Sequence, residues 1–274
     1  MSHQTLTNKH LEDYNQNGYT IVRGMFTQPE TDLLYKTALE DELVSKNAFD
    51  LNDQTGKKTK LTLWYNPGDD IYGLLARSKR VVQGVQTLLG GKDVCHYHSK
   101  LMQKEPRVGG AWEWHQDYGY WYKSGFLFPD AMISVMVALS EATIENGCLQ
   151  VIKGSHKLGR VEHGFAGEQV GAKIEYVNAC LERMDLVYVE LKPGDVLFFH
   201  SNILHRSEAN NSDRARWSMI SAYNLSFNKP AFDENVSSIT SITMVDDSSI
   251  LAGKGSKLSA KSDFLQKQND VALK

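Results

Sequence analysis

The sequence contains little cysteine and no long apolar run. Only three cysteines occur in 274 residues, Cys95, Cys148 and Cys180, and no two of them form a CxxC pair. This excludes a disulfide-stapled scaffold and a cysteine-based zinc site, and it suits a reducing compartment. The longest apolar stretch, residues 131–139, is interrupted by Ser134 and is too short to cross a membrane.

The sequence also lacks an excess of one charge, and we expect no signal peptide. The chain has 30 Lys and Arg against 33 Asp and Glu, a net charge of −3. This balance gives no broad attraction to nucleic acid or to an anionic membrane, so we expect neither as a partner. The first residues lack the apolar region of a signal peptide, and we expect a cytoplasmic protein. The hydrophobic content of 41% is typical of a folded chain with a sizeable core.

The pattern changes from helical to β-rich along the chain. Helical spacing covers residues 5–17, 28–44 and 71–90, a strand is expected at 19–22, and the polar residues 45–70 indicate a long loop. From residue 94, short strands alternate with turns, at 94–103, 131–139, 148–152, 186–191, 196–200 and 216–225. This favours an antiparallel sandwich or barrel. We therefore expect one domain over 1–274, with helical support over 1–92, a β core over 93–227 and a surface tail or short helix over 246–274.

The segment Trp114-His115-Gln116-Asp117 is the first candidate site. If it is extended, His115 and Asp117 point to the same face, since side chains alternate along a strand. An imidazole and a carboxylate can supply two ligands of a metal site, and the third must come from elsewhere. Alone, the pattern also describes a surface strand with two polar residues.

A second group of polar residues follows a turn and an apolar strand. His200 ends that strand and His205 lies just beyond it, so either can supply a third metal ligand. Arg216 opens the next strand, which is mostly apolar, and a buried guanidinium requires a paired anion. The alternative is that Arg214 and Arg216 are two exposed edge residues.

Together these segments resemble the phytanoyl-CoA dioxygenase family of Fe(II)/2-oxoglutarate-dependent oxygenases. The resemblance covers about residues 5–225 and rests on NGYTIVRGMF at 17–26, HQD at 115–117, ALSEATIENGCLQVIKGSH at 138–156 and HRSEANNSDRAR at 205–216. It implies a mainly β fold with flanking helices, the double-stranded β-helix (jelly-roll, cupin-like). It also implies an enzyme that uses Fe(II), O₂ and 2-oxoglutarate to hydroxylate a C–H bond of a small molecule, with release of succinate and CO₂.

The resemblance also implies which residues hold the iron. His115, Asp117 and His205 match the family's ligands, which leaves His200 with a structural or supporting role. Three protein ligands leave three positions on octahedral iron, two for the 2-oxo acid and one for O₂.

The same resemblance assigns residues to the cosubstrate. Arg216 and Ser207 match the residues that hold the remote carboxylate of 2-oxoglutarate, and Lys100 lies near a position that contacts it. Arg214 is left as a surface or supporting residue.

Aromatic and histidine side chains near these motifs are candidates for a substrate pocket. Four aromatic residues bracket HQD and are predicted to line it: Trp114, Tyr118, Tyr120 and Trp121. Aromatic walls suit an apolar or a cationic substrate. No Lys/Arg cluster near the motif is available for the phosphates of an acyl-CoA, which favours a small polar metabolite. His96 and His98 are expected on one face of strand 94–103, as packing or pocket residues.

Two other functions remain open from the sequence. One is a jelly-roll sensor or binding protein that keeps the metal without turnover. The other is a cupin-type isomerase or oxygenase that does not use 2-oxoglutarate. The triad together with Arg216 favours the 2-oxoglutarate enzyme, because a simple binding protein has no need of all four residues.

Overall fold

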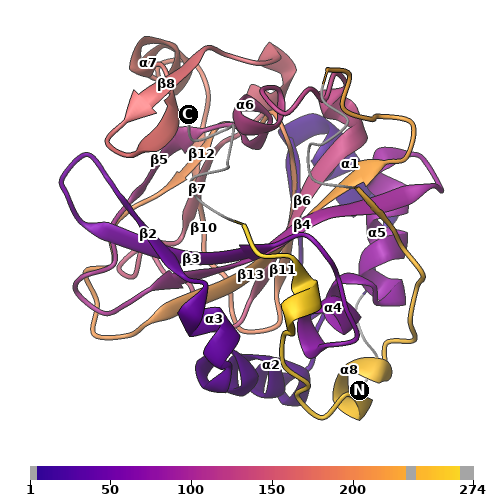
Figure 1. Cartoon of the computed structure of the whole chain (residues 1–274). Helices are drawn as coiled ribbons and strands as arrows, with labels where there is room; N and C mark the ends of the chain where they lie inside the picture. The colour runs from indigo at the N-terminus through magenta and orange to yellow at the C-terminus, as the bar shows by residue number, and fades with distance from the viewer. Residues whose placement is uncertain (1–4, 233–238, 266–274) are drawn as a thin grey trace.

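The structure is a computed structural model that describes residues 5–232 and 239–265 (Figure 1). Its helices are α1 (Asn8–Asn17), α2 (Gln28–Glu40), α3 (Glu42–Lys46), α4 (Ile71–Ala76), α5 (Lys79–Leu89), α6 (Asp117–Trp121), α7 (Ile174–Leu181) and α8 (Ser249–Ala252), with 3₁₀ turns η1 (Pro129–Ala131), η2 (Ser155–Leu158) and η3 (Ala260–Ser262). Its strands are β1 (Tyr19–Val22), β2 (Phe49–Asn52), β3 (Lys58–Trp64), β4 (Val94–Lys104), β5 (Trp112–His115), β6 (Met132–Ala138), β7 (Leu149–Ile152), β8 (His163–Ala166), β9 (Gln169–Ala172), β10 (Leu186–Val189), β11 (Val196–His200), β12 (His205–Ser207), β13 (Arg216–Leu225) and β14 (Thr240–Ser241).

Two antiparallel sheets form the body of the protein. The larger has the strand order β1-β11-β6-β13-β4-β3-β2, with β14 also paired to β4, and the smaller has the order β10-β7-β12-β5. Strands β8 and β9 form a separate hairpin. The expected mainly β fold with flanking helices is therefore confirmed, and the expected strands over 94–225 are present with end points shifted by no more than a few residues.

The larger sheet separates two apolar cores. On one side, Trp217, Met219 and Tyr223 of β13 pack with residues of α2, α4 and α5. On the other side, Met102 of β4 and Ile220 of β13 face residues of β7 and β10 from the smaller sheet. We call the second side the inner face. Alternation along β4 and β13 thus decides which side chains enter the space between the sheets.

An extra residue interrupts this alternation in β4. Across the pair of β4 with β13, His98 lies opposite Ala222 and His96 lies opposite Tyr223, so Tyr97 has no counterpart. Such a bulge redirects the side chains that follow it. The expectation that His96 and His98 share a face is therefore wrong: His96 contacts Tyr223 in the helix-side core, and His98 is on the inner face.

Two other expectations differ from the structure. The predicted loop 45–70 contains the hairpin of β2 and β3, which extends the edge of the larger sheet. The polar residues of this segment predicted a loop, but exposed positions of an edge strand also accept polar residues. The segment 246–265 is not simply a surface tail, since Ile250 and Leu258 are buried in the helix-side core. The rest of the predicted tail lies outside the described residues.

Candidate metal centre

Three buried side chains converge between the two sheets. His115 ends β5, Asp117 begins α6, and His205 begins β12 directly opposite His115. Asp117 Oδ1 lies 3.8 Å from His115 Nε2 and 3.9 Å from His205 Nε2. The ligand atoms of the three residues all lie within 4.8 Å of one another. Among the described residues, no other group of three His, Cys, Asp or Glu side chains comes together in this way.

The chain reaches this arrangement through a turn rather than an extended strand. Strand β5 stops at His115, and Gln116 leads into α6, so the expected extended HxD segment is only partly present. The Gln116 amide donates to the carbonyls of Gly159 at 2.8 Å and Asn202 at 2.7 Å, and its oxygen accepts from Val161 N. Gln116 is fully buried and fixes the turn between the first two ligands.

Hydrogen bonds orient each ligand toward the common centre. The Nδ1 atoms of His115 and His205 lie 2.7 Å from Glu113 O and 3.0 Å from Ile203 O, so each Nδ1–H donates to a carbonyl. This tautomer leaves both Nε2 lone pairs for a metal. Ser134 Oγ donates to Asp117 Oδ2 at 2.5 Å, which leaves Oδ1 for the same purpose.

The electrostatic environment keeps the ligands in their metal-binding forms. Burial, with the neighbouring His205, holds the pKa of His115 well below its usual range, and burial also lowers the pKa of His205. Burial alone would raise the pKa of Asp117, but Lys100 and His205 lower it below its ordinary value. Two neutral imidazoles and one carboxylate, buried together, are the donor set of the facial triad that holds non-haem Fe(II). The residues present therefore fit the ion.

His200 does not belong to this cluster. Its Nε2 lies 3.1 Å from Asp130 Oδ1, and its Nδ1 accepts from Asn202 N at 3.0 Å. Both ring nitrogens are thus engaged elsewhere, and His205 is the histidine that joins His115 and Asp117.

A pair of buried cations lies on the inner face near the other end of β12. Arg216 and Lys104 are direct partners across β13 and β4, and they are 4% and 0% exposed. Arg216 donates to Gly147 O at 2.8 Å, and its Nε has no hydrogen-bond partner. Lys104 donates to the carbonyls of Ser207 and Glu208. Neither cation forms an ion pair with a carboxylate in the part of the chain that the structure describes.

Burial disfavours the protonated form of both cations. Burial lowers the pKa of Arg216 to about 10. Burial, together with the charge of Arg216, holds the pKa of Lys104 well below its ordinary value. An enclosed anion would relieve both effects, because buried charges require a counter-charge.

The remaining predicted cosubstrate residues lie on the two facing sheets. Ser207 is buried two residues after His205 on β12. Lys100 lies four residues before Lys104 on β4, and its charge acts on all three triad residues. Lys104 was not predicted from the sequence, although its spacing from Lys100 places both on one face of a strand that is otherwise buried.

The predicted aromatic pocket residues take different places. The Tyr120 ring lies 5.6 Å from that of His115, with its hydroxyl donating to Val170 O at 2.6 Å. Tyr118 and Trp121 pack in a cluster with Tyr97 and other residues.

Trp114 does not lie with the triad. It precedes His115 on β5 and therefore points to the opposite side of the strand. There it packs among Ile152, Val177 and Leu204, and the guanidinium of Arg206 lies 5.0 Å from its ring. The prediction that Trp114 lines the pocket is wrong for this reason.

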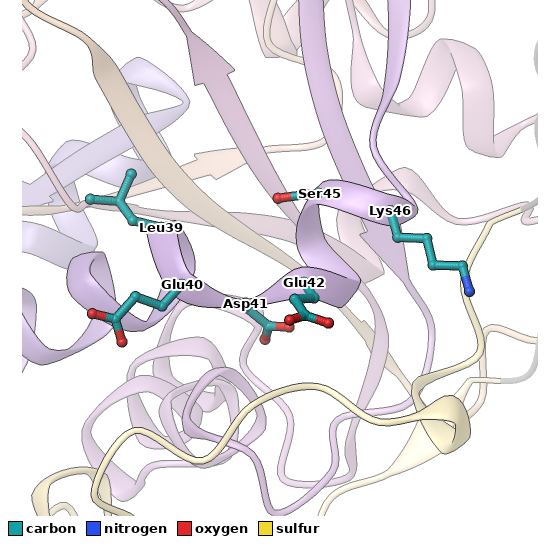
Figure 2. Close-up of a pocket in the computed structure, with 6 residues that line it drawn as sticks. All are labelled: Leu39, Glu40, Asp41, Glu42, Ser45 and Lys46. Carbon is teal, nitrogen blue, oxygen red and sulfur yellow. The ribbon is translucent and has the colours of Figure 1, made fainter.

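A surface hollow elsewhere on the molecule is separate from this centre (Figure 2). Six residues around the junction of α2 and α3 line it: Leu39, Glu40, Asp41, Glu42, Ser45 and Lys46. In Figure 1, α3 lies below β2 and β3, whereas β5 and α6 lie in the upper part of the view. The carboxylate of Asp41 accepts hydrogen bonds from Leu43 N and Leu258 N, so it serves the local structure.

Comparison with known proteins decides the family. A model described as phytanoyl-CoA dioxygenase (PhyH) matches residues 14–218. The chain belongs to the phytanoyl-CoA dioxygenase family, whose members are Fe(II)/2-oxoglutarate-dependent oxygenases. The expected family, enzyme class and cofactors are thereby confirmed. No helix among the described residues is long and apolar enough to span a membrane.

Characterised relatives of the family act on different molecules. An L-proline trans-4-hydroxylase from Streptomyces griseoviridis is 33% identical over 180 residues, which cover 60% of this chain and 66% of that enzyme. A phytanoyl-CoA dioxygenase from Arabidopsis thaliana is 33% identical over 118 residues, 43% of this chain and 40% of that protein. The chain thus matches less than two thirds of the length of either relative.

Solved structures share the fold over nearly the whole chain. EctD from S. alaskensis with 2-oxoglutarate and 5-hydroxyectoine has a TM-score of 0.69 and 21% identity, and the match covers 90% of each chain. SnoK, a non-heme alpha ketoglutarate dependent carbocyclase from nogalamycin biosynthesis, has a TM-score of 0.67 and 18% identity, covering 97% of this chain and 100% of that one.

Proposed function

We propose that this protein is an Fe(II)- and 2-oxoglutarate-dependent dioxygenase that hydroxylates a C–H bond of a small-molecule metabolite and releases succinate and CO₂. The observation that carries the proposal is the presence, between the two sheets, of a buried facial triad and a buried cation pair that lacks a carboxylate. A metal site alone would not require the cation pair. A 2-oxo dicarboxylate has one end for the metal and one for the cations.

The triad residues hold and orient the metal. His115, Asp117 and His205 supply two Nε2 atoms and Oδ1, and their backbone and Ser134 hydrogen bonds keep those atoms pointed inward. Bound Fe(II) supplies the activation of O₂ that couples oxidative decarboxylation of 2-oxoglutarate to hydroxylation.

The cation pair is the proposed site for the remote carboxylate of 2-oxoglutarate. Arg216 has its Nε available, and a guanidinium can hold a carboxylate through two parallel N–H donors. Lys104 supplies a second charge and donates to the carbonyl of Ser207, which lies on β12 of the facing sheet. We assign Lys100 to the end of the cosubstrate nearer the triad, because its charge acts on the triad residues.

The substrate class is proposed as small and polar. No Lys/Arg cluster flanks HQD in the sequence, as the phosphates of an acyl-CoA would require. The proline hydroxylase among the relatives supports this class, since its name specifies an amino acid.

A substrate screen tests the proposal. Purified protein with Fe(II), O₂ and 2-oxoglutarate is incubated with a panel of amino acids, other carboxylic acids and cyclic amines, and succinate is measured. We expect at least one metabolite to raise succinate release and to gain one oxygen atom. Asp117→Ala is the inactive control. Binding of Fe(II) without binding of 2-oxoglutarate would instead support the sensor or cupin-type alternative.

A further inference from the structure

One buried histidine on the inner face is not used by the metal or by the cation pair. His98 is 6% exposed and lies on β4, two residues before Lys100. The bulge at Tyr97 turns it away from the helix-side core, where His96 lies. The rings of Tyr97 and Trp121 lie 4.8 Å and 5.9 Å from the His98 ring.

The imidazole of His98 lacks the hydrogen bonds that other buried histidines make. Its Nδ1 is enclosed and has no hydrogen-bond partner among the described residues. His96, by comparison, bonds to Tyr65 O at 3.1 Å and to Ser99 Oγ at 2.8 Å. Buried polar groups are almost always paired, so the missing partner of His98 is expected from outside the chain.

The surroundings of His98 indicate the charge of that partner. Besides burial, three ionisable groups act on the His98 imidazole: Lys100, Asp117, and His96 on the far side of the strand. Asp117 has one oxygen directed to the metal centre and the other bonded to Ser134. That carboxylate is therefore engaged, and the proposed function places Lys100 beside 2-oxoglutarate. With Fe(II) and 2-oxoglutarate bound, the positive charges of the metal, Lys100, Lys104 and Arg216 still outweigh those of Asp117 and the two cosubstrate carboxylates, so a further anionic group beside His98 is favoured.

We propose that His98 is a substrate-binding residue that donates a hydrogen bond to a carboxylate of the substrate, which is therefore a small carboxylic or amino acid. This inference rests on the proposed function, because it places a second molecule beside the iron and 2-oxoglutarate. The rings of Tyr97 and Trp121 form the wall on which the non-polar part of that molecule packs.

The test compares carboxylates with their own amides. The probes are L-proline, L-pipecolate and cyclopentanecarboxylate, each paired with its primary amide, added to the anaerobic Fe(II)·2-oxoglutarate protein. Perturbation of the visible iron-to-2-oxoglutarate charge-transfer band reports binding. We expect at least one carboxylate to bind about tenfold more tightly than its amide, as for one hydrogen bond to a charged group.

Variants at position 98 separate this role from a structural one. His98→Phe keeps a ring against Trp121 and should abolish the preference for the carboxylate, whereas His98→Asn or His98→Gln should restore part of it. The affinity for 2-oxoglutarate should stay within about twofold in each. His156→Phe, at a half-buried histidine near α1, is the matched control and should keep the preference.

Three results would overturn the inference. They are the absence of a carboxylate preference in every wild-type pair, its retention in His98→Phe, and loss of the charge-transfer band in all three His98 variants. A wild-type protein that forms no band with 2-oxoglutarate would instead contradict the proposed function itself.

Discussion

Replacement of Arg216 should weaken cosubstrate binding and stabilise the protein that lacks cosubstrate. The guanidinium is buried next to Lys104, and no carboxylate of the described residues pairs with either cation. Burial lowers the pKa of Arg216 to about 10, and that of Lys104 lies well below its ordinary value. The carboxylate of 2-oxoglutarate relieves this unfavourable arrangement when it binds.

Replacement of Arg216 should lower the affinity for 2-oxoglutarate and raise the stability of the protein without cosubstrate. A hydrogen bond between charged groups contributes about 1.5–3 kcal/mol. Arg216→Ala should therefore weaken 2-oxoglutarate binding by about 10- to 100-fold, at about 1.4 kcal/mol for each factor of ten. Arg216→Met keeps much of the volume without the charge. Without cosubstrate it should raise the free energy of unfolding by about 1 kcal/mol or more, since buried charges are costly.

The assay combines two titrations on the same variants. Anaerobic titration of the Fe(II) protein with 2-oxoglutarate, followed by the charge-transfer band, gives the affinity. Urea unfolding without 2-oxoglutarate gives the stability. Arg216→Lys keeps the charge but not the planar fork and should rescue binding only in part.

Arg214→Ala is the matched control. Arg214 is exposed and forms a surface ion pair with Glu141 at 2.6 Å, so its loss should change stability by about 1 kcal/mol at most. Its affinity for 2-oxoglutarate should equal that of the parent. Arg216 does not hold the carboxylate if Arg216→Ala binds 2-oxoglutarate as tightly as the parent, or if Arg214→Ala is the variant that loses binding.

Three further predictions concern the metal centre and its surroundings. His205→Ala should lose tight Fe(II) binding in equilibrium dialysis, whereas His200→Ala should retain it, because His200 bonds to Asp130 and Asn202 instead; the reverse result would make His200 the ligand. Burial lowers the pKa of His115 and of His205, so both imidazoles stay neutral at lower pH. Two histidines with ordinary pKa values near 6.5 would lose metal affinity on the order of 100-fold between pH 7.5 and 5.5, and this protein should lose much less. Competition dialysis at a series of pH values checks this, and a loss on the order of 100-fold would contradict it. Gly147→Ala should destabilise the fold by about 1–2 kcal/mol or more, because the residue has a φ of +78° and an added Cβ would lie 2.2 Å from Glu208 O. The same variant should weaken 2-oxoglutarate binding, since Arg216 donates to Gly147 O. Unchanged values in the urea and 2-oxoglutarate titrations would count against both statements.

The sequence predicted the parts of the site that lie in or beside regular strands. The short strands after residue 94 and the positions of His115 and His205 follow from alternation and turns, and antiparallel pairing of β5 with β12 brings the two histidines together. The position of Asp117 at the start of α6 could not be predicted in this way. It depends on the buried amide of Gln116, which bonds to segments more than 40 residues away.

Other features depend on contacts that a single sequence does not display. The bulge that puts His96 and His98 on opposite faces arises from the pairing of β4 with β13, more than 100 residues apart. The predicted loop before residue 70 forms an edge hairpin because β4 offers a partner for β3. Ser134 was visible in the sequence as the one polar residue in an apolar run, yet its bond to Asp117 emerged only from the structure.

The most direct test of the central claim is the visible spectrum of the anaerobic protein with Fe(II) and 2-oxoglutarate. We expect a weak charge-transfer band that appears only when both are present, because the triad holds the iron and leaves positions for the 2-oxo acid. Asp117→Ala and His205→Ala should show no band at the same concentrations. A wild-type protein without the band, or a His205→Ala protein with the full band, would contradict the claim that His115, Asp117 and His205 form the site for Fe(II) and 2-oxoglutarate.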